Sequence, residues 1–171
     1  LIDTTHNTAS GQSMNFDGTD NYTIQYNYMK DSEAGSFVLN HQASNNVFRY
    51  NVSEGIGETQ WMRNLGALDT HIYNNTVYLK PGQDVNFIYN GHTINAAEDP
   101  ATNVWCHNNI FYSAGGTITG DLINSIPGSS GIFISNNVYY GTFTELPVED
   151  GHPLYVNPEF VGPIGGGDVD A

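Results

Sequence analysis

Short runs of hydrophobic and aromatic residues recur along the chain, and each continues through asparagine into further hydrophobic residues. The five runs cover residues 23–28, 47–52, 72–77, 104–111 and 132–139. Their anchoring asparagines are Asn27, Asn51, Asn75, Asn109 and Asn137, at spacings of 24, 24, 34 and 28 residues. A second set of runs, which begins at Ser13, Phe37 and Trp61, repeats at the same step of 24. Two β-type runs per repeat, without long helical periodicity, predict one coil of a parallel solenoid for each repeat.

The asparagines have a physical role in such a coil. Stacked coils lie about 4.8 Å apart, so an inward asparagine can bond the backbone at a corner and the same residue in the next coil. Such a ladder satisfies buried polar groups, and asparagine also tolerates the left-handed backbone of a sharp corner. A β-sandwich with ordinary turn asparagines is the alternative, but a sandwich does not keep a 24-residue register. The pattern therefore predicts an all-β solenoid of about five to six coils with an asparagine ladder.

The coils resemble those of right-handed parallel β-helix proteins, the pectate-lyase-like superfamily of carbohydrate-active proteins. The similar segments are 24–28 with 31–35, 74–78 and 108–112, and the segment 153–160 is similar to one that closes such a helix. The resemblance covers about residues 10–163 and implies a right-handed parallel β-helix. It leaves the reaction open, because the superfamily includes lyases, hydrolases, esterases and adhesins.

The domain organisation follows from this fold. We expect coils and a C-terminal closing segment over residues 1–163, and a flexible tail or linker over 164–171. The longest insertions, 90–103 and 115–131, either wall a cleft or are tolerated surface loops. A solenoid end needs a cap, and no amphipathic capping helix precedes Asn15. We therefore expect the chain to be part of a longer helix, with N-terminal coils or a second subunit beyond Leu1.

The net charge of the chain limits the kinds of partner that it can bind. Four Lys and Arg against 18 Asp and Glu give a formal net charge of −14. This charge argues against nucleic acid and an anionic membrane as partners, and against a polyanionic substrate unless calcium bridges the two. No run of 18 apolar residues is present, and a single cysteine, Cys106, excludes an internal disulfide framework. The composition suggests a secreted or cell-surface protein.

One candidate groove lies on the second set of runs. The positions that follow these runs at steps of 24 are Asp17, His41 and Leu65, and Trp61 and Arg63 lie on the third run. Stacked coils would place these side chains on one face. An indole can stack on a pyranose ring while polar groups hold its hydroxyls, so the set suits sugar binding. The alternative is a set of scattered surface residues.

The densest carboxylates form a second candidate site. Asp31 and Glu33 follow the Asn27 run, and Glu54 and Glu58 follow the next one. Adjacent coils can bring two carboxylates to the 5–9.5 Å or so that glycoside hydrolysis needs. The same cluster could bind Ca²⁺, which takes oxygen ligands, or consist only of solvated turn acids.

A groove poor in cations favours neutral or amino sugars over uronates. Among β-helix enzymes the chain is most similar to lacto-N-biosidase-like glycoside hydrolases, in residues 15–17 and 26–35. We predict a glycoside hydrolase that acts on an oligosaccharide or polysaccharide without a cofactor, Ca²⁺ being the alternative. A calcium-dependent polysaccharide lyase fragment and a non-catalytic carbohydrate-binding adhesin remain open. The predicted catalytic residues are Asp17, Asp31 and Glu33. The predicted substrate-binding residues are His41, Glu54, Glu58, Trp61 and Arg63.

Overall fold

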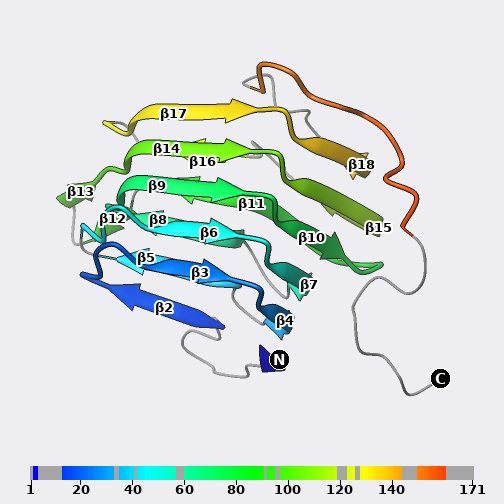
Figure 1. Ribbon diagram of the computed structural model, residues 1–171, viewed down its shortest axis with the longest axis horizontal. Helices are drawn as coiled ribbons and strands as arrows, with labels where there is room; N and C mark the ends of the chain where they lie inside the picture. The colour runs from blue at the N-terminus through cyan, green and yellow to red at the C-terminus, as the bar shows by residue number, and fades with distance from the viewer. Residues whose placement is uncertain are drawn as a thin grey trace.

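Strands, turns and bends make up the part of the chain that the computed structural model describes, and no helix occurs there (Figure 1). The described residues are 2–3, 13–32, 35–40, 42–56, 60–90, 92–94, 97–118, 123–125, 128–143 and 150–160. No segment among them is a helix long and apolar enough to cross a membrane.

Three stacks of parallel strands run along the molecule, and each coil adds one strand to each stack. The β2 stack contains β2 (Met14–Asp17), β5 (Phe37–Asn40), β8 (Gln60–Leu65), β11 (Asp84–Asn90) and β16 (Ile123–Ser125). The β3 stack contains β3 (Thr23–Gln25), β6 (Val47–Arg49), β9 (Leu68–Tyr73), β14 (Thr102–His107) and β17 (Ser130–Ser135). The β4 stack contains β1 (Ile2–Asp3), β4 (Tyr28–Ser32), β7 (Val52–Ile56), β10 (Thr76–Leu79), β15 (Ile110–Ile118) and β18 (Val138–Phe143).

This arrangement is the predicted all-β parallel solenoid. It has about four turns, because the five ladder asparagines bound four coil-to-coil steps. The predicted number was five to six. Strand β1 and the segment 150–160 account for the difference, since each adds only part of a turn to the described solenoid.

The corner between the β3 stack and the β4 stack has the same backbone in each described coil. One residue with φ between 54° and 58° precedes the ladder asparagine. These corner residues are Tyr26, Tyr50, Asn74, Asn108 and Asn136. The left-handed conformation turns the chain sharply enough to start the next strand, and asparagine adopts it more readily than most residues.

The asparagines form a continuous hydrogen-bonded column inside this corner. At each of the four steps the side-chain Nδ2 donates to the Oδ1 of the next coil over 3.0 Å. The backbone N–H of each asparagine donates to the same oxygen. At the end of the column, Asn137 donates to Asp150 Oδ2 from both Nδ2 (2.9 Å) and N (3.2 Å). A carboxylate only accepts hydrogen bonds, so Asp150 terminates the ladder.

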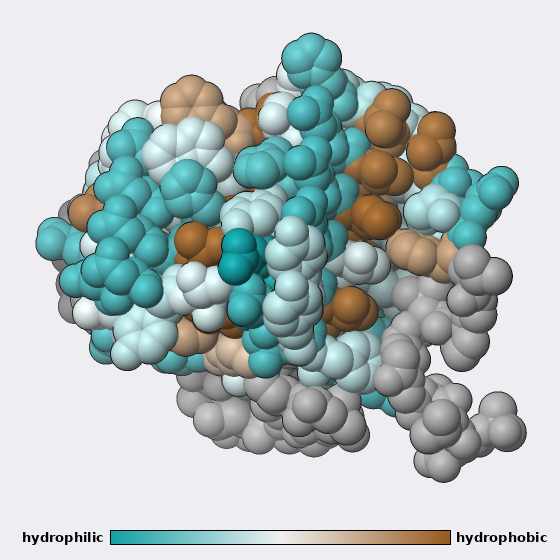
Figure 2. Space-filling model, viewed as in Figure 1, coloured by the Kyte–Doolittle hydropathy of each residue, from teal (hydrophilic) through white to brown (hydrophobic). Residues whose placement is uncertain are grey.

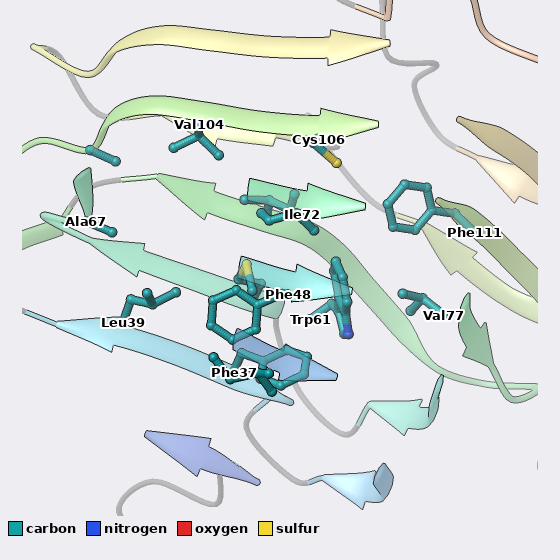
Figure 3. Close-up of a cluster of buried hydrophobic side chains, with 14 of the residues drawn as sticks. Phe37, Leu39, Phe48, Trp61, Ala67, Ile72, Val77, Val104, Cys106 and Phe111 are labelled. Carbon is teal, nitrogen blue, oxygen red and sulfur yellow. The ribbon is translucent and has the colours of Figure 1, made fainter. Parts of the chain in front are cut away.

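The hydrophobic core fills the space between the three stacks (Figure 3). Phe37, Phe48, Trp61 and Phe111 are its largest side chains and are each at most 2% exposed. Their rings meet edge to face, with Trp61 in contact with both Phe37 and Phe111. Alternate residues of each strand point inward and supply this core, as the period of two in the sequence requires.

The register of the β2 stack differs from the uniform 24-residue step. Met14 pairs with Phe37, 23 residues later, and Phe37 pairs with Met62, 25 residues later. Asp17 therefore lies opposite Asn40, which lies opposite Leu65. The predicted alignment of Asp17 with position 41 is wrong by one residue, because turns of slightly different length precede these strands.

The two predicted insertions have different structures. Residues 90–103 contain an antiparallel hairpin of β12 (His92–Ile94) and β13 (Ala97–Asp99), outside the three stacks. Residues 115–131 are not simply a loop, because they include the end of β15, strand β16 and the start of β17. The β16 strand pairs with β11 and continues the β2 stack.

Candidate functional site

Two carboxylates from adjacent coils meet at one lysine on the β4 stack. Lys80 Nζ lies 2.7 Å from Asp31 Oδ1 and 3.4 Å from Glu54 Oε1. Asp31 is the residue after Lys30, which pairs with Glu54 across the coil step. We call Asp31, Glu54 and Lys80 the acidic cluster. The sequence predicts that Asp31 and Glu54 lie close together, and in the structure they do. It does not predict that a lysine contacts both.

The backbone of the acidic cluster is shaped for close approach. Asp31 and Gly55 both have positive φ, 53° and 69°. A Cβ at Gly55 would lie 2.3 Å from Asp31 Oδ1, so only glycine lets this carboxylate reach the lysine.

The two carboxylates have different surroundings. The Asp31 side chain is 38% exposed and the Glu54 side chain 9%. The hydroxyl of Tyr28 donates a hydrogen bond to Glu54 Oε2. A solute in the surrounding water can contact the Asp31 carboxylate. The Glu54 carboxylate is mostly buried and is held in place by the hydrogen bond from Tyr28.

Lys80 stays charged in this setting. Partial burial disfavours its ammonium form, but the hydrogen bond to Asp31 and the charges of Asp31 and Glu54 outweigh burial and raise the pKa of Lys80. The ammonium group therefore balances part of the negative charge of the acidic cluster over the whole physiological pH range.

A column of tyrosines continues the line of Glu54 along the outer face of the β4 stack. Register places Tyr78, Tyr112 and Tyr140 on successive coils beyond Glu54. The Tyr78 and Tyr112 rings stack with centroids 5.4 Å apart, and those of Tyr112 and Tyr140 are 5.1 Å apart. Burial, followed by the neighbouring Tyr112 and the charge of Glu54, raises the pKa of Tyr78.

A cavity of about 470 Å³ opens at the far end of the same column. Its described lining residues are Tyr139, Tyr140, Gly141, Phe143 and Tyr155. From Glu54 to Tyr140 the column covers three coil steps, about 14 Å at the usual strand spacing. The acidic cluster and this cavity thus lie at opposite ends of one tyrosine column, and Tyr140 belongs to both the column and the cavity lining.

The groove predicted on the β2 stack is only partly assembled. Asp17 is exposed at the end of β2, and Arg63 lies on the outer side of β8, where its Nε donates to Gln60 Oε1 over 2.7 Å. Arg63 pairs with Val38 of β5, whereas Asp17 pairs with Asn40 of the same strand. Asp17 and Arg63 are therefore offset by two residues along the strand direction.

Trp61 is not available to a sugar. Its indole points into the core, is fully buried, and donates from Nε1 to Ser53 Oγ over 2.9 Å (Figure 3). The prediction that Trp61 stacks on a pyranose ring is therefore wrong. The sequence pattern placed the whole run on one strip, but adjacent residues of a strand point to opposite sides.

Glu33, His41 and Glu58 lie outside the described residues, and their predicted roles stay predictions. The residues that sequence reasoning missed are Tyr28 and Lys80. Lys80 comes 49 residues after Asp31, and the signal that could have located it is its place five residues after the ladder residue Asn75.

Asp31 and Glu54, the two described residues of the predicted calcium site, do not by themselves form a site for a calcium ion. Within the described ranges no group of three or more His, Cys, Asp or Glu residues could hold a metal. The Lys80 ammonium lies between the two carboxylates, where a cation would bind. Glu33 and Glu58, the other two members of the predicted calcium site, are not described.

Comparison with known proteins gives a family and one relative. A family described as "Disaggregatase related" matches residues 68–159, more than half of the chain. Lacto-N-biosidase from Bifidobacterium longum subsp. longum is 27% identical over 150 residues, which are 87% of this chain and 9% of that protein. The chain thus spans about a tenth of the length of this curated relative. No solved structure matches the chain.

Proposed function

This chain belongs to the disaggregatase-related family, and we propose that it is a glycoside hydrolase unit acting on neutral or amino-sugar oligosaccharides. The similarity to a lacto-N-biosidase supports a carbohydrate substrate. The observation that carries the proposal is the convergence of Asp31 and Glu54 on Lys80. We further propose that the protein acts outside the cytoplasm, where such oligosaccharides are found.

The proposed chemistry needs two carboxyl groups at one glycosidic bond. One carboxylic acid donates its proton to the leaving oxygen, while the other carboxylate either removes a proton from the attacking water or attacks the anomeric carbon. Asp31 is the group that an incoming sugar reaches first, and Glu54 is the group that Tyr28 and Lys80 position. Different surroundings are what allow two carboxyl groups to take different roles.

The tyrosine column supports a place for the rest of the glycan. Tyr78, Tyr112 and Tyr140 extend from Glu54 toward the cavity at β18. Aromatic side chains with a polar hydroxyl suit ligands that have both apolar and polar sides. A short oligosaccharide bound along this column would have its cleaved bond at the acidic cluster and its other end near Tyr155.

The test is product analysis on variants of the carboxylates. Neutral and amino-sugar oligosaccharides are incubated with the chain and with Asp31→Asn and Glu54→Gln, and products are detected by mass spectrometry. We expect each variant to lose at least about a hundredfold in kcat, as is usual for loss of a proton-transfer group. Glu159→Gln, an exposed carboxylate outside the cluster, is the matched control and should keep full activity. Melting temperatures show whether the buried Glu54 variant is folded.

Three other outcomes would replace the proposal. Hydrolysis that survives in Asp31→Asn and Glu54→Gln would place the reaction elsewhere on the molecule. Unsaturated products from a polyuronate, lost on addition of EDTA, would indicate the calcium-dependent lyase. Binding without turnover is the second candidate function, favoured by the way Lys80 balances both carboxylates, and it would make the chain a carbohydrate-binding module.

A further inference from the structure

The outer face of the β3 stack carries aromatic and polar side chains in columns, one residue per coil. Register aligns His71, Trp105 and Phe133 in one column, and Tyr73 and His107 in the next. The His71 and Trp105 rings stack with centroids 4.4 Å apart, and those of Tyr73 and His107 are 5.2 Å apart. Figure 2 shows this face, where a hydrophilic ridge runs across the strands between the β3 stack and the β4 stack.

Two tyrosines occupy the left-handed corner at the first two coils. The same corner position is asparagine in the following three coils, at the same φ. Bulky residues rarely adopt this backbone conformation, so placing tyrosine at positions 26 and 50 costs conformational energy. They contribute little to the core, because Tyr26 is 73% and Tyr50 42% exposed. Backbone strain at exposed residues is a reason to look for a binding role.

The two corner tyrosines form a platform. Their rings stack with centroids 5.4 Å apart and only 7° between the planes. The Tyr50 ring also meets the Tyr73 ring edge to face at 6.3 Å. Tyr26 contacts Tyr50 with one side of its ring and is otherwise exposed, so the other side is open to a ligand.

Arg49 is fixed beside this platform by neutral groups. Its Nε donates to Gln25 Oε1 over 2.8 Å and its Nη1 donates to the Tyr73 hydroxyl over 3.0 Å. The guanidinium carbon lies 5.7 Å from the centre of the Tyr50 ring. No described carboxylate forms an ion pair with it, although acids outnumber bases by 18 to 4 in the chain. A guanidinium has five N–H donors, so several remain for a ligand.

We propose that Tyr26, Tyr50 and Arg49, with Gln25 and Tyr73, form a second carbohydrate-binding site, on a different strand stack from the acidic cluster. Its ligand is a neutral pyranoside of a glycan chain. The flat apolar side of the sugar stacks on Tyr26, and its hydroxyls accept hydrogen bonds from Arg49. The site binds glycan and takes no part in bond cleavage, so it does not depend on hydrolysis at Asp31.

Replacing each corner tyrosine by asparagine, the corner residue of the later coils, tests binding without disturbing the fold. Tyr26→Asn and Tyr50→Asn introduce the residue that the same corner uses at 74, 108 and 136, so the variants should melt at or above the parent temperature. Binding of galactose and N-acetylhexosamine oligosaccharides to the whole chain is measured by titration calorimetry. We expect the Kd of the double variant to rise at least about fivefold, and Arg49→Gln to weaken binding as well. Tyr22→Asn is the control and should bind as the parent does, because Tyr22 is similarly exposed but its ring is tilted against Phe16 at 6.5 Å and is not part of the platform.

Asp31→Asn distinguishes this site from the proposed catalytic one. The variant should keep glycan binding at the platform whether or not the chain proves to be a hydrolase. Unchanged affinity in Tyr26→Asn/Tyr50→Asn, with the fold intact, would overturn the proposal. Binding that is seen only with polyuronates and is lost at high salt would overturn the assignment of a neutral sugar.

Discussion

Each ladder asparagine satisfies several polar groups that no other residue type could satisfy together. In Asn75, Oδ1 accepts from both the backbone N–H and the Nδ2 of Asn51, while Nδ2 donates to Asn109 Oδ1 and to the carbonyl of Phe48. Asn75 as a whole residue is 1% exposed, so water cannot replace these partners. A short amide with both a donor and an acceptor is the side chain that fits a column repeating at the strand spacing.

Replacing Asn75 should therefore destabilise the fold strongly. In Asn75→Ala, groups of Asn51, Asn109 and Phe48 lose their buried partner, and we expect a loss of about 3 kcal/mol in the free energy of unfolding. Asn27→Ala is the matched variant. It removes the same residue type at the partly exposed end of the described column, and should cost about 1 kcal/mol. Urea unfolding followed by circular dichroism measures the free energy of unfolding of both variants. If both variants lose the same stability, burial of the asparagine does not determine the loss.

Among elements, the β3 stack shows how parallel register organises a surface. Parallel strands without a shift bring equivalent residues of successive coils to about 4.8 Å, which is close to the stacking distance of two flat rings. The Tyr73 and His107 rings are almost parallel, with an angle of 5°. The same register that aligns the ladder asparagines inside the coil thus aligns rings on its outside.

The stacked histidine should make stability depend on pH. Burial, followed by the charge that His71 can carry, lowers the pKa of His107 below its usual value of 6.5. The unfolded chain then binds a proton at higher pH than the folded chain does. The free energy of unfolding should therefore fall as the pH drops through about 6.5 toward the folded-state pKa.

His107→Tyr tests this dependence, because it keeps an aromatic ring against Tyr73 and removes the titrating group. Melting temperatures are compared at pH 7.5 and pH 5.5 for the parent and the variant. We expect the parent to lose more stability than the variant over this interval. An identical decrease in both proteins would show that other groups cause the pH dependence.

At the scale of the whole molecule, charge opposes folding. A net charge of −14 is brought together when the coils stack, and only four Lys and Arg are present to balance it. Screening by salt should reduce this repulsion, since the Debye length falls from about 30 Å at 0.01 M to about 3 Å at 1 M. We expect the melting temperature to be higher in 0.5 M NaCl than in 0.01 M NaCl. A lower melting temperature in high salt would mean that attractive pairs such as Lys80 with Asp31 outweigh the repulsion.

The repeat alone was enough to predict the architecture. A solenoid is built from one local unit, so a 24-residue period, alternation within each run and the recurring asparagine specify strands, corner and core together. The proximity of Asp31 and Glu54 was predictable for the same reason, because both follow a ladder asparagine by nearly equal distances.

What the sequence determined by itself is therefore whatever repeats: the parallel coils, the β-type runs of each coil and the positions of the recurring asparagines. The tertiary structure alone decided the features that break the repeat. It placed Asp17 opposite Asn40, turned Trp61 into the core, and brought Lys80 to Asp31 across 49 residues. The reason is physical: a periodic pattern specifies the average coil, whereas turn lengths, a one-residue change of register and long-range side-chain contacts depend on how particular neighbours pack.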